Sequence, residues 1–354
     1  MNILKVIYHK IPDPVRVRVC YPILRVAYYL KQAKKLRDFV KLGDKNPDKK
    51  IIILYTEARY CGLFSIIYYL RYTMRFALQK NYKVVVDLSQ TDIKEARTYP
   101  QEQSNPWDLF FEQPDGISME EAKHSAHVLR LNSDVLSRFH TNVELNTLSK
   151  RNVHREHVIF ARYVRPTVDL MNYIESQPCT EIIEGKKVLA VSIRSNYRWG
   201  ELIRKPLYNN HPKVPSIGYF IDHIKDFFEK FGYDYFFLSC DDGVWRDRLV
   251  DEFGEKCLYI DRPLGRRFTS DCETAINMFD SDWKPIPVLQ EKLVGDILNE
   301  PYVQGQYEYL AEVWLMSMCT SLFGTESSGT QVAQILNDNR YEEVLYYDGG
   351  LISV

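Results

Sequence analysis

The chain has 354 residues, of which 45% are hydrophobic, and its 46 basic and 47 acidic residues leave a formal net charge of -1. This length suits two domains of ~100–200 residues each better than one α/β core. A balanced charge excludes the global electrostatic field that would recruit nucleic acid. We therefore expect no nucleic-acid partner.

The seven cysteines are scattered and odd in number, and no two of them form a Cys-x-x-Cys pair. This argues against a disulfide framework or a zinc cluster and fits a reducing cytoplasm. Charges interrupt every apolar run near the N-terminus, so no signal peptide is expected. No stretch reaches the ~18 apolar residues that span a bilayer. These features predict a cytoplasmic protein.

The first expected segment, residues 1–45, is basic and amphipathic. Residues 1–41 hold ten lysines and arginines against two aspartates, with aromatic and aliphatic residues between them. A helix over 21–41 would be cationic and amphipathic, which suits peripheral contact with an anionic membrane surface. A solvated helix packed on the following domain explains the pattern equally well.

The second expected segment, residues 46–180, begins with a strand–helix–strand unit, which is typical of a parallel sheet. Residues 89–118 are polar and contain prolines, so we expect a long loop, and loops of this length are often functional. Residues 119–180 are expected to be mostly helical. The strands are predicted over 51–55 and 83–88, and the helix over 63–80.

The third expected segment, residues 181–354, repeats the alternation of strands and helices. Together the two α/β units predict two Rossmann-like domains with parallel sheets facing a central cleft. Ligands of such sheets lie beyond the carboxyl ends of the strands. The strands are predicted over 188–193, 233–238, 257–260, 321–324 and 344–347, and the helices over 217–231, 245–253, 307–318 and 327–336.

Arg194 follows the first strand of this second unit, and Arg198, Gly200 and Glu201 come next in the chain. An arginine in that position can hold a diphosphate bidentately and neutralise the leaving group without a metal ion. The alternative is an ordinary surface arginine after a strand.

Ser327, Ser328, Gly329 and Thr330 lie between a predicted strand and a predicted helix. Backbone N–H groups at a helix N-terminus, with hydroxyl groups beside them, bind phosphate well. The alternative is a plain N-cap, for which serine and threonine are common.

Three carboxylates of this unit are further candidates. Asp241 and Asp242 follow a strand, where they could bind a ribose, a base or a metal ion, or cap the next helix. Because adjacent side chains diverge, we expect no metal site. Glu312 lies in an otherwise apolar helix, and a buried carboxylate is costly unless it is paired. It either accepts hydrogen bonds from a guanine edge or faces solvent.

A basic loop and the first unit supply the remaining candidates. Arg262, Arg266 and Arg267 could reach phosphates or an acidic glycan, but we expect a solvated loop. In the first unit Glu57 could be the general base towards an acceptor hydroxyl, and Arg59 could position phosphate or glycan. Trp107 could stack on a sugar, with Asp108 or Glu112 as alternative bases, or this segment could be a buried turn.

Over roughly 187–337 these segments resemble the fucosyltransferase-like glycosyltransferases, the superfamily of the α1,6-, α1,2- and protein O-fucosyltransferases. The resemblance is carried by 191–201, 237–242 and 310–330, and the segments 62–64 and 80–87 are similar to those of bacterial surface-polysaccharide members. In this family the arginine holds the β-phosphate of GDP-fucose, the serines hold phosphate, and the helix acid meets guanine. The resemblance places these roles on Arg194, on Ser327 and Ser328, and on Glu312.

The resemblance implies a GT-B-like fold in which 46–180 binds the acceptor and 181–354 binds the donor. The implied reaction is a metal-independent, inverting transfer of fucose or a similar sugar from a nucleoside diphosphate, with GDP favoured, to a glycan hydroxyl. The implied setting is surface-polysaccharide or lipopolysaccharide synthesis on the inner face of the membrane. Arg194, Glu57 and Glu201 are the catalytic candidates. The donor-binding candidates are Arg194, Arg198, Asp241, Asp242, Glu312, Ser327, Ser328, Gly329 and Thr330.

Two other classes of protein stay open. A nucleotide-dependent phosphotransferase or sulfotransferase is one, although the chain has no Gly-x-x-x-x-Gly-Lys-Ser/Thr loop. The other is a non-catalytic glycan-binding or assembly protein on a degenerate transferase scaffold. Ser192 stands where the family usually has histidine, and Tyr197 where it has an acidic residue, so the second class fits as well.

Overall fold

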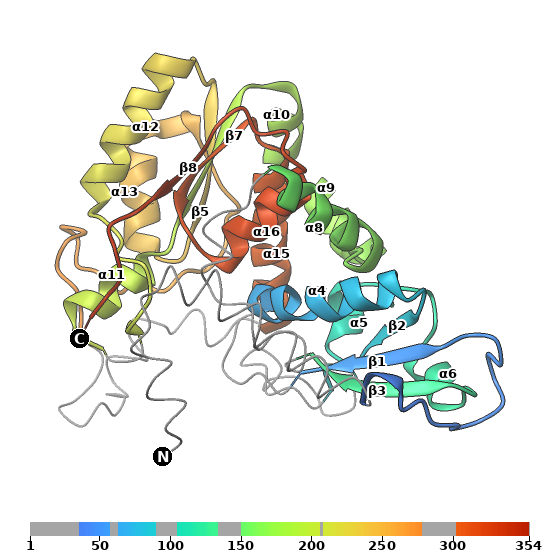
Figure 1. The fold of residues 1–354 in the computed structure, drawn as a ribbon. Coiled ribbons are helices and arrows are strands. Elements are labelled where there is room, and N and C mark those ends of the chain that lie inside the picture. Colours follow the sequence, from blue (N-terminus) through green and yellow to red (C-terminus); the bar gives the residue numbers. More distant parts are fainter. Residues whose placement is uncertain are drawn as a thin grey trace. The chain divides into compact units, whose positions relative to one another are not determined.

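The structure is a computed structural model that describes residues 35–56, 63–89, 105–133, 150–205, 208–277 and 302–353. The described residues form two compact units. The first unit consists of the described residues before 150 and of Val158–Arg165. The second unit consists of Lys150–His157 and of the described residues from Pro166 onward. Each unit contains one sheet of parallel strands with helices beside it (Figure 1). The predicted α/β class with parallel sheets is confirmed, while the cleft remains a prediction.

The first sheet has the strand order β2-β1-β3. Its central strand β1 begins with four apolar residues that are all buried, because a strand in the middle of a parallel sheet is covered on both faces. The helices of this unit are short apart from α4. Its elements are η2 Lys35–Arg37, β1 Ile51–Tyr55, α4 Leu63–Gln79, β2 Lys83–Val86, α5 Trp107–Phe110, α6 Met119–Lys123 and β3 Val128–Asn132. The helix α8 Lys150–Tyr163 is divided, because its residues up to His157 group with the second unit and those from Val158 with the first.

One expectation for the first unit was incomplete and another was wrong. The described part of 119–180 is mostly helical, as expected, but it also contains the strand β3, which pairs with β1 from Ile51 to Tyr55 and completes the sheet. The helix predicted over 21–41 does not continue to its end: Lys35–Arg37 form a 3₁₀ turn, and Val40 exchanges two backbone hydrogen bonds with Val128. Residues 1–34 lie outside the described part, so the membrane contact remains a prediction. Within the described residues no helix is long and apolar enough to cross a membrane.

The second sheet has the order β6-β5-β4-β7-β8. The chain runs outward from β4 to β6 and then returns to the other side of β4 as β7, so the direction of winding switches between β4 and β7. The strands are β4 Val188–Ile193, β5 Tyr235–Cys240, β6 Cys257–Leu258, β7 Ser321–Thr325 and β8 Val344–Tyr347. All six residues of β4 and all five of β7 are buried.

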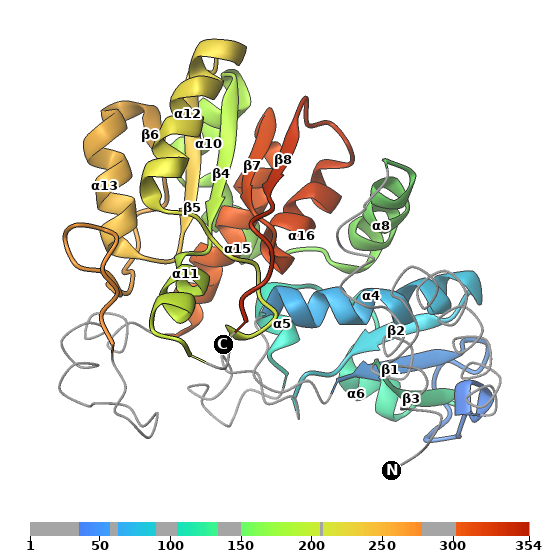
Figure 2. The same ribbon diagram turned by 60° about the vertical axis from the view of Figure 1, so that its left-hand side comes forward.

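Helices cover both faces of this sheet (Figures 1 and 2). On one face α12 and α13 pack over alternate residues of β4 and β5, including Val191 and Leu238. On the other face α15 contacts β4 and β5, and α16 packs against α15. The helices are α9 Val168–Glu175, α10 Cys179–Gly185, α11 Ser195–Leu202, α12 Ile217–Phe231, α13 Gly243–Phe253, α15 Tyr302–Met318 and α16 Ser328–Asn337, with the 3₁₀ turn η5 Gly254–Lys256.

The structure divides the chain earlier than the expected boundary near 180. Helices α9 and α10 both contact α15, and their buried residues Leu170, Ile174 and Cys179 belong to the second unit. Residues 166–180 therefore group with the second sheet, because their apolar side chains are buried there. The acceptor and donor roles of the two domains remain predictions.

A glycine is required where β4 and β7 pair. Gly324 lies opposite Ser192 in the parallel register, and a Cβ atom built on it would stand 2.1 Å from the Ser192 carbonyl oxygen. Its φ of +155° is also one that residues with side chains rarely adopt. The two strands can therefore approach each other at their carboxyl ends only because this position has no side chain.

We predict that Gly324→Ala destabilises the protein by about 3 kcal/mol, because the new methyl group overlaps backbone atoms that cannot move aside. Gly185→Ala is the matched control, since a Cβ atom there would meet nothing within 4 Å. Urea unfolding of both variants measures the difference. Equal stability of the two variants would contradict the close approach of β4 and β7.

Candidate functional site

The candidate site lies at the carboxyl ends of β4 and β7. Arg194 follows β4 directly and Glu326 follows β7, and the backbone N of Arg194 lies 3.5 Å from Oγ1 of Thr325. Since the winding switches between these two strands, the segments after them diverge, and ligands of open parallel sheets bind at such a point. The structure thus brings Arg194 together with the segment that starts α16.

Arg194 is a charged group held against a tyrosine. Its Nη1 lies 3.4 Å from the Tyr309 hydroxyl, and its guanidinium carbon lies 5.5 Å from the centre of that ring. Its Nε is buried and has no hydrogen-bond partner within the described part of the chain. Burial by itself would lower the pKa of Arg194, but the nearby Tyr309 and Asp241 raise it. The guanidinium is therefore a fixed cation with spare hydrogen-bonding capacity.

The N-terminus of α16 lies beside the same tyrosine. Ser327 and Thr330 form a reciprocal capping box, in which each side chain accepts a hydrogen bond from the other's backbone N–H. The N-cap alternative is thus confirmed for Ser327, and the hydroxyl group of Thr330 completes the capping box. A Cβ atom on Gly329 would lie 2.6 Å from the Tyr309 hydroxyl oxygen. Tyr309 therefore contacts both Arg194 and the first turn of α16, where helix N–H groups favour anions.

The adjacent aspartates each hold the start of a helix. Asp241 accepts hydrogen bonds from Ser195 Oγ at 2.6 Å and from the backbone N of Asn196 at 3.4 Å, at the beginning of α11. Asp242 is the N-cap of α13 and accepts from the backbone N of Val244 at 3.0 Å. The capping alternative is confirmed for Asp242. Among the described residues no group of three or more His, Cys, Asp or Glu side chains could hold a metal ion.

Asp242 has no solvent exposure, and burial raises its pKa to about 6 from an ordinary 3.8, although hydrogen bonding and charge from Arg267 oppose the shift. The backbone N of Arg267 lies 2.6 Å from Oδ2 of Asp242. A fully buried aspartate with its acceptors occupied is part of the framework under the site.

Glu312 was expected to meet either guanine or solvent, and the structure shows that it does not face solvent. Arg262 donates to it twice, from Nε to Oε1 at 2.6 Å and from Nη2 to Oε2 at 3.1 Å. Ser239 Oγ donates to Oε2 at 2.7 Å. The carboxylate is 2% exposed. Glu312 is therefore a buried, bidentately paired acid that needs no ligand to satisfy it.

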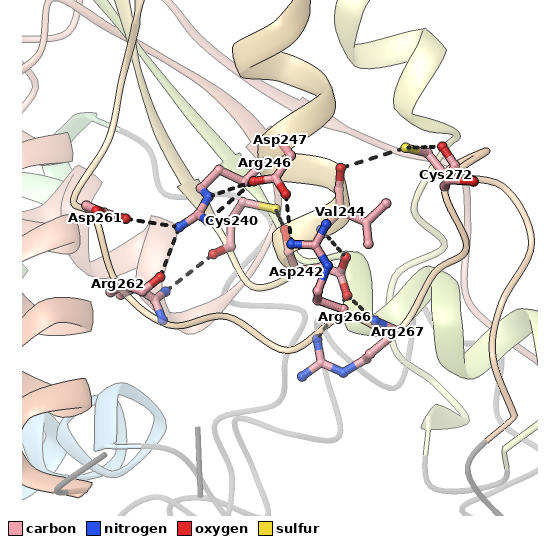
Figure 3. Close-up of polar contacts among 11 residues, drawn as sticks. Cys240, Asp242, Val244, Arg246, Asp247, Asp261, Arg262, Arg266, Arg267 and Cys272 are labelled. Carbon is pink, nitrogen blue, oxygen red and sulfur yellow. Dashed lines mark hydrogen bonds and ion pairs between the residues drawn. The ribbon is translucent and has the colours of Figure 1, made fainter. Parts of the chain in front are cut away.

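The loop that carries Arg262 is hydrogen-bonded to the end of β5 (Figure 3). The expectation of a solvated loop is therefore wrong for Arg262 and Arg267. Arg262 Nη2 donates to the carbonyl oxygen of Cys240, and Arg267 Nη1 donates to that of Asp241 at 2.7 Å. Arg246 from α13 holds the carbonyl oxygen of Arg262 at 2.9 Å. Arg266 is half exposed and pairs with Asp247.

Other predicted residues have partners of their own. Arg198 pairs with Glu273 at 3.5 Å, and Glu201 lies 3.7 Å from Lys213, so on α11 these two side chains have partners of opposite charge. Gly200 packs against the ring of Tyr208. The structure shows no contact between Glu201 and Arg194 among the described interactions.

The candidates of the first unit fall into two groups. Glu57 and Arg59 lie outside the described residues, so the general base remains a prediction. Trp107 is fully buried and donates from Nε1 to the carbonyl oxygen of Glu112 at 3.1 Å, which confirms the buried turn and contradicts sugar stacking. Asp108 accepts hydrogen bonds from Asn105 and Gln113, and burial raises its pKa.

We predict that Arg262→Met destabilises the protein by about 3–5 kcal/mol, because it leaves the Glu312 carboxylate buried without its cation. Arg266→Met, in the same loop but half exposed, should cost under about 1 kcal/mol. The double variant Arg262→Met/Glu312→Met should recover most of the loss. Chemical denaturation measures all three, and equal effects of the two single variants would show that Glu312 does not depend on Arg262.

We predict a pH dependence from Asp242. Since its folded pKa lies above its unfolded pKa, its contribution is fully present below about pH 4 and is lost as pH rises through about 6, by up to about 3 kcal/mol. Asp242→Asn removes this ionisation. The difference in unfolding free energy between wild type and variant should therefore change between pH 4 and 7, and parallel stability curves would contradict the raised pKa.

Comparison with known proteins gives structural neighbours only. No family model matches the chain, and no curated protein matches it. Fucosyltransferases are among the solved structures that it is similar to. NodZ from Bradyrhizobium is 12% identical with a TM-score of 0.47, over 86% of this chain and 98% of that one. POFUT1 in complex with GDP is 9% identical with a TM-score of 0.49, over 85% of this chain and 99% of that one. An Arabidopsis thaliana FUT1 mutant in complex with GDP is 12% identical with a TM-score of 0.43, over 90% of this chain and 75% of that one.

Proposed function

We propose that this chain is a glycosyltransferase that binds a nucleoside-diphosphate sugar at the carboxyl edge of the second sheet and transfers the sugar to a glycan hydroxyl. The observation that carries the proposal is Arg194, a partly buried cation whose buried Nε has no hydrogen-bond partner among the described residues, at the point where the winding of the sheet switches. A guanidinium and a helix N-terminus both bind phosphate groups, and together they suit the two phosphates of a nucleoside diphosphate.

Two positive elements converge on the proposed diphosphate position. The guanidinium of Arg194 and the first turn of α16 both contact Tyr309. When the bond between sugar and phosphate breaks, negative charge develops on the departing diphosphate. A cation and helix N–H groups that are already in place stabilise this charge without reorganisation. We therefore propose that the transfer needs no metal ion, since Arg194 supplies the charge that a metal would supply elsewhere.

The finer details rest on the sequence resemblance. It favours GDP as the nucleotide and fucose or a similar sugar as the group transferred, with inversion. Since Glu312 is already paired with Arg262 and Ser239, we propose that guanine is recognised by other groups than this carboxylate. The general base (Glu57 first), the acceptor role of residues 46–180 and a setting in surface-polysaccharide synthesis at the membrane belong to the same proposal.

A panel of nucleoside diphosphates tests the proposal by thermal unfolding of the purified protein with EDTA present. Binding to the folded state alone stabilises it by about 2.7 kcal/mol when the ligand is at 100 times its dissociation constant. We expect one nucleotide, GDP, to raise the melting temperature of the wild type and to have no effect on Arg194→Ala. Arg248→Ala is the matched control, because Arg248 lies on α13 and pairs with Glu252.

Two results would contradict the proposal. If GDP raised the melting temperature of Arg194→Ala as much as that of the wild type, Arg194 would not bind the nucleotide. The absence of a shift with every nucleotide would favour the glycan-binding or assembly protein on a transferase scaffold, and glycans would then stabilise wild type and Arg194→Ala alike.

A further inference from the structure

Three rings gather next to Arg194, on α11 and on the short segment that follows it. The rings of Tyr197 and His211 are 4.9 Å apart, those of Tyr208 and His211 are 5.6 Å apart, and those of Tyr197 and Tyr208 are 6.1 Å apart. They meet at 51–65°, so the three rings pack edge to face or tilted, and no two of them are stacked in parallel. We call Asn196, Tyr197, Tyr208 and His211 the α11 corner.

Contacts with α11 and with Trp199 fix the position of the α11 corner. Tyr208 packs so closely on α11 that a Cβ atom on Gly200 would lie 2.2 Å from its ring. The ring of Trp199 lies 6.1 Å from that of Tyr208, and Trp199 Nε1 donates to the carbonyl oxygen of Ile276 at 2.8 Å. The rings are therefore held by the framework before any ligand binds.

Two polar atoms of the α11 corner are unsatisfied. Oδ1 of Asn196 and Nδ1 of His211 are buried and lack a hydrogen-bond partner in the part of the chain that the structure describes. Buried polar groups almost always have partners, so two such atoms on one small patch indicate a polar ligand. Nε of Arg198 is also unsatisfied. Arg198 stands two residues from Asn196, on another face of α11, and pairs with Glu273, so we leave it out of the α11 corner.

The α11 corner adjoins the proposed diphosphate position. Arg194 is the N-cap residue of α11, and the backbone N–H of Tyr197 donates to the Arg194 carbonyl oxygen at 3.0 Å. Burial raises the pKa of the Tyr208 hydroxyl, while Arg267, a side-chain hydrogen bond from Asn196 and the charge of Arg194 act to lower it. A group bonded directly to a phosphate that Arg194 holds would therefore lie at these rings.

From this arrangement we infer that the α11 corner binds the sugar of the nucleotide-sugar donor. A sugar presents C–H faces to aromatic rings, and its hydroxyl groups donate to an amide oxygen and bond with an imidazole nitrogen. Asn196 and His211 supply these polar atoms, and Tyr197 and Tyr208 supply the rings. This inference rests on the proposed function, since it requires the diphosphate at Arg194.

Two variants of the full-length protein separate sugar binding from nucleotide binding. Asn196→Ala removes the amide oxygen within a helix, and His211→Phe keeps the ring and removes both nitrogens. His223→Phe is the matched control, because His223 also stacks on a tyrosine, Tyr219, at 3.8 Å, but on α12 and with its Nδ1 at 2.9 Å from the Tyr219 carbonyl oxygen. Isothermal titration with GDP and with GDP-fucose, separately, gives both affinities for every protein.

We expect both variants to bind GDP as the wild type does and to bind GDP-fucose about three- to tenfold more weakly. His223→Phe should bind both ligands normally. Unchanged GDP affinity also shows that the variants are folded. GDP-fucose affinity equal to that of wild type would overturn the inference. An equal loss for GDP and GDP-fucose would assign the α11 corner to the nucleotide and also overturn it. A wild type that binds neither ligand would overturn the proposed function, and the inference with it.

Discussion

The parallel pairing of β4 with β7 is the constraint on which the site depends. These strands are neighbours in the sheet, although more than a hundred residues separate them in the chain. Their register places Ser192 opposite Gly324, and the missing side chain of Gly324 allows the backbones to meet. Everything that follows them at the carboxyl edge, Arg194 from one strand and the start of α16 from the other, is positioned by this contact.

The polar groups near this edge differ in whether their hydrogen bonds are complete. Glu312 and Asp242 are buried and fully paired, so they hold the loop after β6 and the start of α13 in place. Arg194, Asn196 and His211 each keep an unsatisfied buried atom in the described structure. Buried polar groups with complete hydrogen bonds belong to the framework, and buried polar atoms without a partner indicate where a polar ligand binds. Whether the hydrogen bonds of a residue are complete therefore distinguishes framework residues from ligand-binding residues better than its charge does.

The strands and helices of the second unit follow from local patterns. The apolar run 188–193 and the amphipathic helix 217–231 have the bounds expected, because burial on both faces and helical periodicity are visible in a short window. The strand β3 was missed, since five residues with one exposed arginine, Arg130, carry little of either signal. Its existence depends on its pairing with β1.

The site was predictable only in part, because some of its contacts join residues that are far apart in the chain. Arg194 and the turn before α16 could be found because each follows a clear strand. The pairing of Arg262 with Glu312 joins positions 50 residues apart, and no local pattern shows it. Tyr309 could have been suspected, because it lies one helical turn before Glu312 on α15 and therefore on a similar face. Its contact with Arg194 is a property of the folded sheet.

Hydrogen–deuterium exchange with and without GDP tests the central claim, which is that Arg194 and the N-terminus of α16 form one anion site. Backbone N–H groups that bind phosphate exchange more slowly, so the method reports on the proposed contact itself. We expect GDP to slow exchange in two separate segments, 194–198 and 326–331, and much less in 217–231 on α12. Slower exchange confined to other segments, or none in 326–331, would contradict the account.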